Sequence, residues 1–548
     1  MAGASNFNIT FRNIKYGNDA YPNNNYYGIL YIGGSYNNIN FVVENVDYNI
    51  QTGAQPFYAN GQTNTLTFKG KNNFKAVTSN GASGEFAEGF TSINFSDDSQ
   101  TTIYNDTAAA TALFWGPANQ VITVGQNALV DISTSKEYLS YNGNLTLKVL
   151  ENGLFKYRAI SGTSHSTQTA ALKAVGTIAM EFSQDSIGHF TTDKNGFSGP
   201  NPTISVNSPN YILFDASSSN KAVLSGLVPK FVRKDTDGNN YPINYLTKTG
   251  QAELTPNVTP SQTVSVSNAN IKSGYSVAYT RAPRIMQLSG IPETGTDVSK
   301  VSAQVAQWTP ENMGAGTKVS YKLARNKLYT QSDISDSAAQ SSINNDTTVP
   351  TQIQDVTTNI ATDSYYEYSN LSPQTYYLYS KIEDFHVAGY TLSSPWVEQA
   401  LEVKPYIEIS LPDALTFQSP KAGAIMTDTQ LTDNLVVNHG NVPVNLDLKS
   451  LTVKADSSSK VSLVSKVQGK KQLHLQLVSQ SLSGNGNSVI WNPLLVGPFS
   501  GQSIRLTPYW EDGQKASLSL SGEHSVSILD GGPYQVNYGL NVAVSQAT

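Results

Sequence analysis

Cysteine is absent from this chain of 548 residues, which excludes disulfide bonds, thiolate metal ligands and thiol nucleophiles together. Charge is scarce too, because Asp, Glu, Lys and Arg make up 14% of the residues against about 25% in a typical soluble protein. No run of about 18 apolar residues occurs, so the sequence predicts no membrane insertion. No long basic tract occurs either, and the net charge is −6. Neither nucleic acid nor an anionic membrane surface is therefore an expected partner.

The residues that take the place of charge are chiefly Asn, Ser, Thr, Gln, Gly and Tyr, and the chain contains 41 Gly and 30 Tyr. β-Branched and aromatic side chains suit strands, whereas Asn and Gly suit the turns between strands. A long helical bundle would need far more Ala, Glu, Lys and Leu. The composition therefore predicts an all-β protein, and the length predicts about two to four domains.

Residues 8–222 contain short runs of alternating apolar and polar residues, separated by Asn, Gly, Asp and Ser. Gly28–Ile32, Ile39–Val43 and Leu145–Val149 are examples of these runs. Strands this short suit the coils of a solenoid, in which each coil buries its face against the next. At about 20–25 residues a coil, the span predicts roughly ten coils and a rod about 50 Å long. An array of β-sandwiches gives similar local patterns and remains the alternative.

Three segments of this region follow one another in a recognisable order, namely Tyr27–Ile32, Ile39–Tyr48 and Gln55–Tyr58. Together they resemble the pectate-lyase-like adhesive domain of Gram-positive surface proteins, and the resemblance covers residues 6–225. It implies a right-handed parallel β-helix that is used for adhesion rather than cleavage. We expect this first domain to span residues 1–280.

A second domain is expected at residues 281–405, after the boundary marked by Ala282-Pro283. Leu, Pro, Thr and Tyr stand at alternate positions from 371 to 377, in a Leu-x-Pro-x-Thr-x-Tyr spacing. This spacing is similar to the tyrosine-corner sequence of fibronectin type III domains, which implies an immunoglobulin- or fibronectin-like β-sandwich. In such a corner Tyr377 would bury its ring and bond its hydroxyl to nearby backbone. The insert at residues 327–358 is rich in Ser, Asp, Asn and Gln, and we interpret it as a solvated loop. The residues that carry this resemblance are Leu371, Pro373, Thr375 and Tyr377.

A third domain, also a β-sandwich, is expected at residues 406–548. Pro412–Phe417 resembles the opening strand of the WxL domains that dock on Gram-positive cell walls. This resemblance implies docking to the wall or to a partner protein, although both signature tryptophans are replaced, by Leu446 and by Tyr538. The residues that match the two Trp-x-Leu motifs are Leu446, Leu448, Tyr534, Tyr538 and Leu540.

Candidate catalytic and metal sites are sparse. A lyase with a β-helix fold needs several acidic Ca²⁺ ligands on one face and a base at the sugar. The nearest acidic cluster contains Asp97, Asp98 and Asp106, which we interpret as turn residues, and we assign no catalytic residue. In a second segment, side chains with oxygen atoms occur at alternate positions and a glycine is present, as in a Ca²⁺-binding loop. No Glu follows at the distance needed for a bidentate ligand. A hairpin turn is the preferred interpretation there, with Ca²⁺ as the alternative and no other cofactor expected. The residues of that segment are Asp235, Asp237 and Asn239.

Aromatic residues are the more informative feature. Exposed rings stack on sugar faces, and the neighbouring Asn side chains donate and accept hydrogen bonds with hydroxyl groups. For the amino-terminal tyrosines we favour capping of the open end of the rod, with glycan contact as the second hypothesis. Trp115 is a further candidate, for which buried packing is favoured over ligand contact. The candidate ligand-binding residues are Tyr26, Tyr27, Tyr31, Tyr36 and Trp115.

The expected function is non-catalytic adhesion at the surface of a Gram-positive bacterium. The β-helix would bind a host or environmental glycan or protein through many weak contacts on a rigid surface. The carboxyl-terminal module would hold the protein non-covalently to peptidoglycan or to other surface proteins. Residues 1–5 show no signal peptide, and we expect a secretion leader to have been removed. Two alternatives remain: a polysaccharide lyase or glycoside hydrolase with a β-helix fold, and a structural scaffold within a surface complex.

Overall fold

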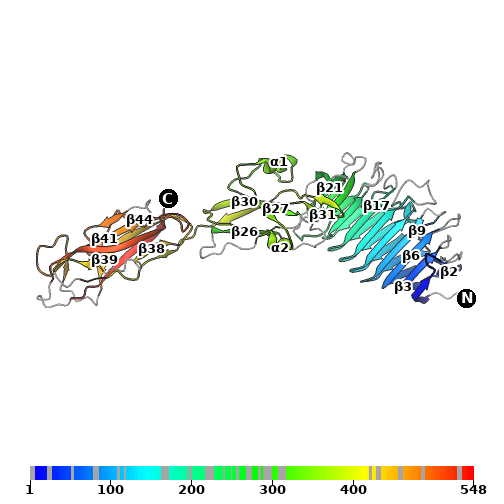
Figure 1. Ribbon diagram of the computed structural model, residues 1–548, viewed down its shortest axis with the longest axis horizontal. Helices are drawn as coiled ribbons and strands as arrows, with labels where there is room; N and C mark the ends of the chain where they lie inside the picture. The colour runs from blue at the N-terminus through cyan, green and yellow to red at the C-terminus, as the bar shows by residue number, and fades with distance from the viewer. Residues whose placement is uncertain are drawn as a thin grey trace.

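In the computed structural model, strands account for 55% of the structure and helices for 3%, which confirms the prediction of an all-β protein. Figure 1 shows a stack of coils at the amino-terminal end and further sheets toward the carboxyl-terminal end. The residues that the structure describes are 6–20, 28–50, 55–77, 85–107, 112–116, 119–161, 172–193, 197, 200–215, 228–237, 241–247, 250–254, 258–266, 275–281, 285–287, 299–305, 316–418, 422–427, 434–454, 461–482, 488–526 and 534–547.

A parallel β-helix forms the amino-terminal part, as predicted, and its coils pair strand upon strand (Figure 1). The parallel strands of its larger sheet are β1 (Asn8–Tyr16), β3 (Asn40–Ile50), β5 (Asn64–Lys69), β6 (Lys71–Val77), β8 (Phe90–Phe95), β9 (Gln100–Asp106), β11 (Asn119–Val124), β12 (Leu129–Thr134), β14 (Asn144–Val149), β15 (Leu154–Ala159), β16 (Ile178–Phe182), β17 (Ile187–Thr192), β18 (Thr203–Val206), β19 (Tyr211–Asp215) and β20 (Lys230–Arg233). A second parallel sheet contains five short strands, which are β2 (Leu30–Ile32), β4 (Phe57–Ala59), β7 (Ala87–Glu88), β10 (Ala112–Trp115) and β13 (Tyr138–Tyr141).

Most coils are longer than predicted. Paired residues on successive coils are 33 positions apart at Leu145 and Ile178, and 24 apart at Ala179 and Thr203. The expectation of 20 to 25 residues a coil was too short, because the segments between the strands differ in length from coil to coil. The same span therefore contains fewer coils than the roughly ten that were expected.

Each coil bends within the larger sheet at one residue in the left-handed conformation. The φ angles there lie between 54° and 63°, a region that glycine adopts freely and that Asn and Asp tolerate best among the other residues. The bends of successive coils lie one above another, which brings their side chains into hydrogen-bond contact. The Asn127 amide donates to Asp98 at 3.0 Å, and the Asn152 amide donates to Asn127 at 3.2 Å. The bend residues are Asn13, Asn45, Gly70, Asp98, Asn127, Asn152, Asp185 and Ser208.

Inward-facing side chains of successive coils stack into one core. The Phe57 ring contacts Phe68, Phe74 and Phe86 at centroid distances of 5.5–6.0 Å, and Phe68 stacks on Phe95 at 5.0 Å. Strand alternation places these apolar residues inside and their polar neighbours outside. A rigid, continuous interior therefore supports the outward-facing residues of every coil.

Antiparallel strands close the carboxyl-terminal end of the β-helix and connect it to the next part of the chain. These strands are β21 (Ile243–Thr247), β22 (Gly250–Leu254), β23 (Thr263–Ser265) and β24 (Ser276–Thr280). The Tyr390 hydroxyl donates to Asp215 at 2.8 Å, and the Gln251 side chain bonds to both the N–H and the C=O of Ser393. Leu246 of the closing strands also packs in the same buried cluster as Val387.

Two sheets and one short helix of the middle part share that buried cluster, and a second helix packs in a separate cluster. One sheet contains β25 (Ile285–Gln287), β26 (Val301–Val305) and β29 (Tyr366–Tyr368). The other contains β27 (Lys318–Ala324), β28 (Gln352–Asp355), β30 (Gln374–Glu383) and β33 (Val397–Val403). A hairpin joins β31 (Phe385–Val387) to β32 (Tyr390–Leu392), and the helices are α1 (Ser337–Asn345) and α2 (Ile360–Asp363).

The expected tyrosine corner lies one residue earlier than predicted. Tyr376 is buried and its hydroxyl donates to the Ser372 carbonyl at 3.1 Å, whereas Tyr377 is only partly buried, with Lys327 above its ring. Successive strand residues point to opposite faces, so an assignment that is wrong by one position exchanges the buried residue for the outer one. Leu371 packs at the edge of the core, while Pro373 and Thr375 lie beside the corner.

The insert at residues 327–358 is not only a solvated loop. It contains α1, whose N-cap Asp336 accepts a hydrogen bond from the Ala338 N–H. Ala339 and Ile343 of the helix are buried against Trp396, in a cluster separate from the main core. The polar composition hid this helix because only these two positions, one turn apart, carry its buried face.

The carboxyl-terminal part contains two larger sheets around a third buried cluster. One contains β34 (Ile409–Ser410), β36 (Gly423–Ala424), β38 (Leu435–Asn438), β40 (Ser462–Leu463), β41 (Gln472–Ser481), β42 (Val489–Trp491) and β45 (Lys515–His524). The other contains β39 (Val444–Val453), β43 (Gly497–Pro498), β44 (Ser503–Leu506) and β46 (Tyr538–Gln546). A small hairpin is formed by β35 (Phe417–Gln418) and β37 (Met426–Thr427).

Candidate functional site

The short sheet of the β-helix carries a line of outward-facing residues, one from each coil. The residue registers pair Tyr31 with Tyr58, Tyr58 with Glu88, Glu88 with Trp115 and Trp115 with Tyr141. Residues paired in this way on parallel strands point to the same face. The residue before each of them is buried, so these five point away from the core. We call Tyr31, Tyr58, Glu88, Trp115 and Tyr141 the ring ladder.

The aromatic rings of the ladder contact one another at both ends. Tyr31 and Tyr58 are stacked, with ring centroids 4.9 Å apart and an angle of 16° between their planes. Trp115 and Tyr141 are 4.7 Å apart and tilted, and Tyr138 meets Tyr141 edge-on at 5.1 Å. The Tyr31 side chain is 54% exposed, while the other rungs are partly buried. Neighbouring rings thus hold one another in fixed orientations and leave edges and hydroxyl groups at the surface.

Glu88 breaks the aromatic series in the middle of the ladder. The Gln55 amide donates to the Glu88 carboxylate at 2.6 Å and also to the carboxylate of Glu85, which is buried. Burial raises the pKa of Glu88 above its ordinary value of 4.5, and the nearby charge of Glu85 raises it further, while the hydrogen bond from Gln55 acts in the opposite direction. Burial, followed by the charge of Glu88, likewise raises the pKa of the Tyr58 hydroxyl. The centre of the ladder therefore contains two neighbouring carboxyl groups that share one hydrogen-bond donor.

Sequence reasoning named two of these five residues as candidates, Tyr31 and Trp115, although it favoured end capping for Tyr31 and buried packing for Trp115, and it missed the other three. A signal for the rest is present, because a glycine follows each rung within three residues and recurs every 27 or 28 positions. The backbone requires this glycine at Gly89, where φ is 84° and a Cβ atom would overlap the Ala59 carbonyl oxygen. The glycines of this period are at positions 33, 61, 89, 116 and 143.

No known protein family and no curated protein matches this chain. The resemblances to adhesive, fibronectin type III and WxL domains therefore remain predictions, whereas the β-helix is observed directly.

The other aromatic candidates are not rungs of the ladder. Tyr36 meets Phe7 edge-on at 6.2 Å and packs against the core at the amino-terminal end. Tyr26 and Tyr27 lie outside the residues that the structure describes.

The candidate Ca²⁺ loop contains a buried ion-pair network. The Arg233 guanidinium lies 2.9 Å from both Asp235 and Asp237, and its side chain is only 3% exposed. Asp235 also accepts from the Ser208 N–H, and Asp237 accepts from the Tyr241 hydroxyl, both at 2.8 Å. These bonds engage the oxygen atoms that a cation would need. Asn239 lies outside the described residues.

Four of the positions that resemble the Trp-x-Leu motifs lie on two paired strands, although they are not opposite one another in the register. Leu446 and Leu448 are buried on β39, and β39 pairs antiparallel with β46. Tyr538 and Leu540 on β46 are partly buried against the same cluster, and Lys471 lies over the Tyr534 ring at 5.3 Å. The two motifs, which are about 90 residues apart in the sequence, therefore belong to one strand pair.

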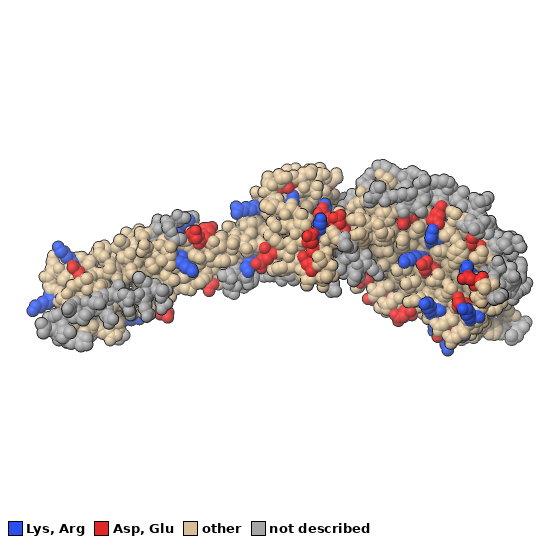
Figure 2. All heavy atoms as spheres, viewed as in Figure 1, with Lys and Arg blue, Asp and Glu red and all other residues tan. Residues whose placement is uncertain are grey.

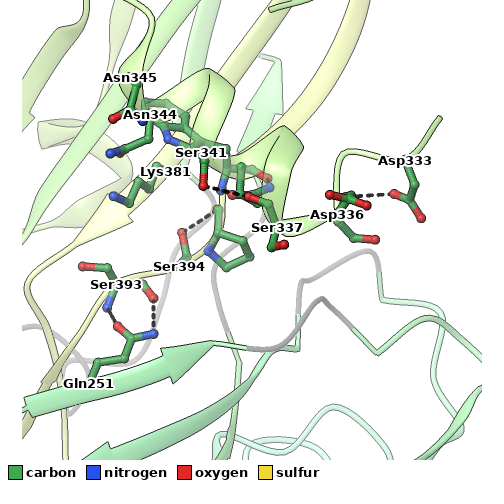
Figure 3. Close-up of a pocket in the computed structure, with 14 residues that line it drawn as sticks. Gln251, Asp333, Asp336, Ser337, Ser341, Asn344, Asn345, Lys381, Ser393 and Ser394 are labelled. Atoms are coloured by element: carbon green, nitrogen blue, oxygen red, sulfur yellow. Dashed lines mark hydrogen bonds between the residues drawn. The ribbon is translucent and has the colours of Figure 1, made fainter. Parts of the chain in front are cut away.

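A pocket of about 800 Å³ lies beside α1, where hydroxyl and amide side chains surround its mouth (Figure 3). Ser337 and Asn344 come from the helix, Ser394 comes from the facing segment, and Gln251 reaches the pocket from the β-helix. Within the described ranges, no three His, Cys, Asp or Glu side chains group as metal ligands would. In the same ranges, no helix is long and apolar enough to cross a membrane. Figure 2 shows charged residues scattered among uncharged ones on the visible face.

Proposed function

We propose that this protein is a non-catalytic binding protein of a bacterial cell surface, and that its β-helix binds a glycan chain along the ring ladder. The observation that carries the proposal is the register of Tyr31, Tyr58, Glu88, Trp115 and Tyr141 on five successive coils. Aromatic residues supply large contact area together with polar edges, a combination that suits sugars. Because adjacent rings and the packed interior already fix these side chains, little conformational entropy is lost when a ligand binds.

The second part of the proposal concerns attachment. The carboxyl-terminal sheets would bind peptidoglycan or another surface protein non-covalently, which keeps the β-helix at the far end of the molecule (Figure 1). Support comes from the β39–β46 pair, which unites the two segments that resemble docking motifs. Many copies on one cell would then raise the overall avidity of weak individual contacts.

A glycoside hydrolase is the second candidate, and the carboxylate pair at the centre of the ladder favours it. Glu85 and Glu88 accept from the same Gln55 amide, and glycosidases act through two neighbouring carboxyl groups. Catalysis would require both groups to reach the sugar, yet Glu85 is 4% exposed beneath the surface. Binding is therefore the better supported function. Release of new reducing ends from a bound polysaccharide would show that the protein is a hydrolase instead.

The test is a panel of polysaccharides and purified cell walls, titrated with the intact chain and with Trp115→Ala. The variant should bind roughly tenfold more weakly, because one ring contact contributes about 1–1.5 kcal/mol. Tyr104→Ala is the matched control, since Tyr104 is an exposed ring on the larger sheet. Equal affinity for Trp115→Ala and the unmodified chain would contradict the placement of the site. Failure of the unmodified chain to bind any member of the panel would contradict glycan binding altogether.

A further inference from the structure

Glu88 separates the two aromatic pairs of the ring ladder, so that the aromatic rungs on either side of it are two coils apart. We call the space between these two rungs the interval. Tyr58 and Trp115 each stand one coil from Glu88, on opposite sides. Paired strands are about 4.8 Å apart, so the two aromatic positions are separated by roughly 9.6 Å. A pyranose ring midway between them would lie about 4.8 Å from each, within the range of ring contacts. The interval therefore has the width of one sugar ring held between two aromatic rings.

The carboxylates at this interval indicate which charged group a bound sugar ring should carry. Glu85 and Glu88 both accept from the Gln55 amide, and among the described residues no Lys or Arg acts on the Glu88 carboxylate. Aromatic faces attract cations as well, most strongly where water is excluded. Burial makes the ionised form of Glu88 costly, as its raised pKa shows, and a bound cation would offset that cost. Carboxylated sugars would be repelled from the same place.

We propose that the interval over Glu88 is the subsite for a protonated amino sugar, so that the ligand is a polysaccharide with free amino groups. This inference rests on the proposed function, because it assigns a substrate class to the same ladder. The ammonium group would pair with Glu88 while Tyr58 and Trp115 cover the two faces of the sugar ring. A lysine side chain carries the same charge, but its narrow alkyl chain covers less of the two aromatic ring faces than a sugar ring does.

The experiment compares two probes with the intact chain, a glucosamine hexamer and the matching N-acetylglucosamine hexamer. Titrations at about pH 6 keep the free amino groups protonated. The glucosamine hexamer should bind at least about tenfold more tightly, as expected for a hydrogen bond between charged groups. Glu88→Gln keeps the shape of the side chain and should bind the two hexamers equally. Asp131→Asn is the control, because it removes the same charge from a residue on the larger sheet.

Equal binding of the two hexamers by the unmodified chain would overturn the amino-sugar subsite and leave glycan binding intact. A preference that survives in Glu88→Gln would also overturn it. If neither hexamer binds, the subsite is wrong, and the polysaccharide panel decides separately whether the proposed function fails. Circular dichroism of Glu88→Gln checks that the β-helix is folded. As a second variant, Tyr58→Leu should reduce the preference without changing the charge.

Discussion

Single side chains at the coil bends set the path of the β-helix. Asn127 combines two roles, because its φ of 55° lies in the left-handed region and its side chain bonds to Asp98 and Asn152. Gly70 adopts the left-handed conformation but has no side chain that could form hydrogen bonds with the bends of neighbouring coils. Four of the eight bend residues are Asn, which meets the need for one left-handed residue in each coil.

The two roles of Asn127 can be separated by substitution. Asn127→Ala should destabilise the local structure by about 1–2 kcal/mol through the left-handed backbone, in addition to the lost hydrogen bonds. Asn127→Gly should lose the same hydrogen bonds without the backbone strain and so be the more stable variant by about 1 kcal/mol. Hydrogen-exchange mass spectrometry of peptides spanning residues 119–134 measures the free energy of local opening. Equal protection of the two variants would argue against a strained bend.

The residues of the site were only partly predictable from the sequence. Large rings in a charge-poor chain stand out, which is why Tyr31 and Trp115 were selected. Glu88 did not stand out, because its importance comes from Tyr58 and Trp115, its neighbours on adjacent coils about 30 residues away in the sequence. The varying coil length concealed that register, although the recurring glycines preserve it.

At the scale of elements, alternation of apolar and polar residues identified strands well and helices poorly. The prediction of a parallel β-helix succeeded because each coil repeats the same inward and outward pattern. Helix α1 was missed because Ala339 and Ile343 are its only buried residues. The tyrosine corner was found in the right segment but assigned to the wrong residue, since Tyr376 and Tyr377 are adjacent and the spacing alone does not distinguish them.

The corrected corner predicts different effects for two adjacent residues of β30. Tyr376→Phe removes the hydroxyl that bonds to Ser372 and should cost about 1 kcal/mol of stability. Tyr377→Phe should change stability much less, because the Tyr377 hydroxyl is not the corner donor. Hydrogen exchange in peptides covering residues 366–383 reports both effects on the middle part alone. A larger effect from Tyr377→Phe would restore the original assignment.

At the scale of the whole molecule, the β-helix and the middle sheets are held together by polar and apolar contacts. Tyr390 bonds to Asp215 and is buried, Gln251 bonds to Ser393, and Leu246 packs in the shared cluster. These contacts join residues that are more than 140 positions apart in the sequence. The junction should therefore behave as a fixed connection.

A distance measurement tests that connection, and the absence of cysteine makes site-specific labelling simple. Spin labels at Lys156→Cys and Glu402→Cys, both at exposed strand positions, should give one narrow distance distribution. Adding Tyr390→Ala with Gln251→Ala should broaden the distribution, because loss of a buried aromatic side chain typically costs about 3–5 kcal/mol. Ile353→Ala, at an exposed position, is the control. A broad distribution in the labelled but otherwise unmodified chain would contradict a fixed junction.

The alternation within the short strands separates specificity from stability. In β4, Tyr58 faces outward between two fully buried residues, Phe57 and Ala59, and the inward residue of every short strand maintains the interior in the same way. Replacing an outward residue leaves that interior unchanged, so the ligand preference can be altered by substitutions at the rungs without redesign of the scaffold. A library randomised at the five rungs would therefore sample many binding specificities on one stable framework.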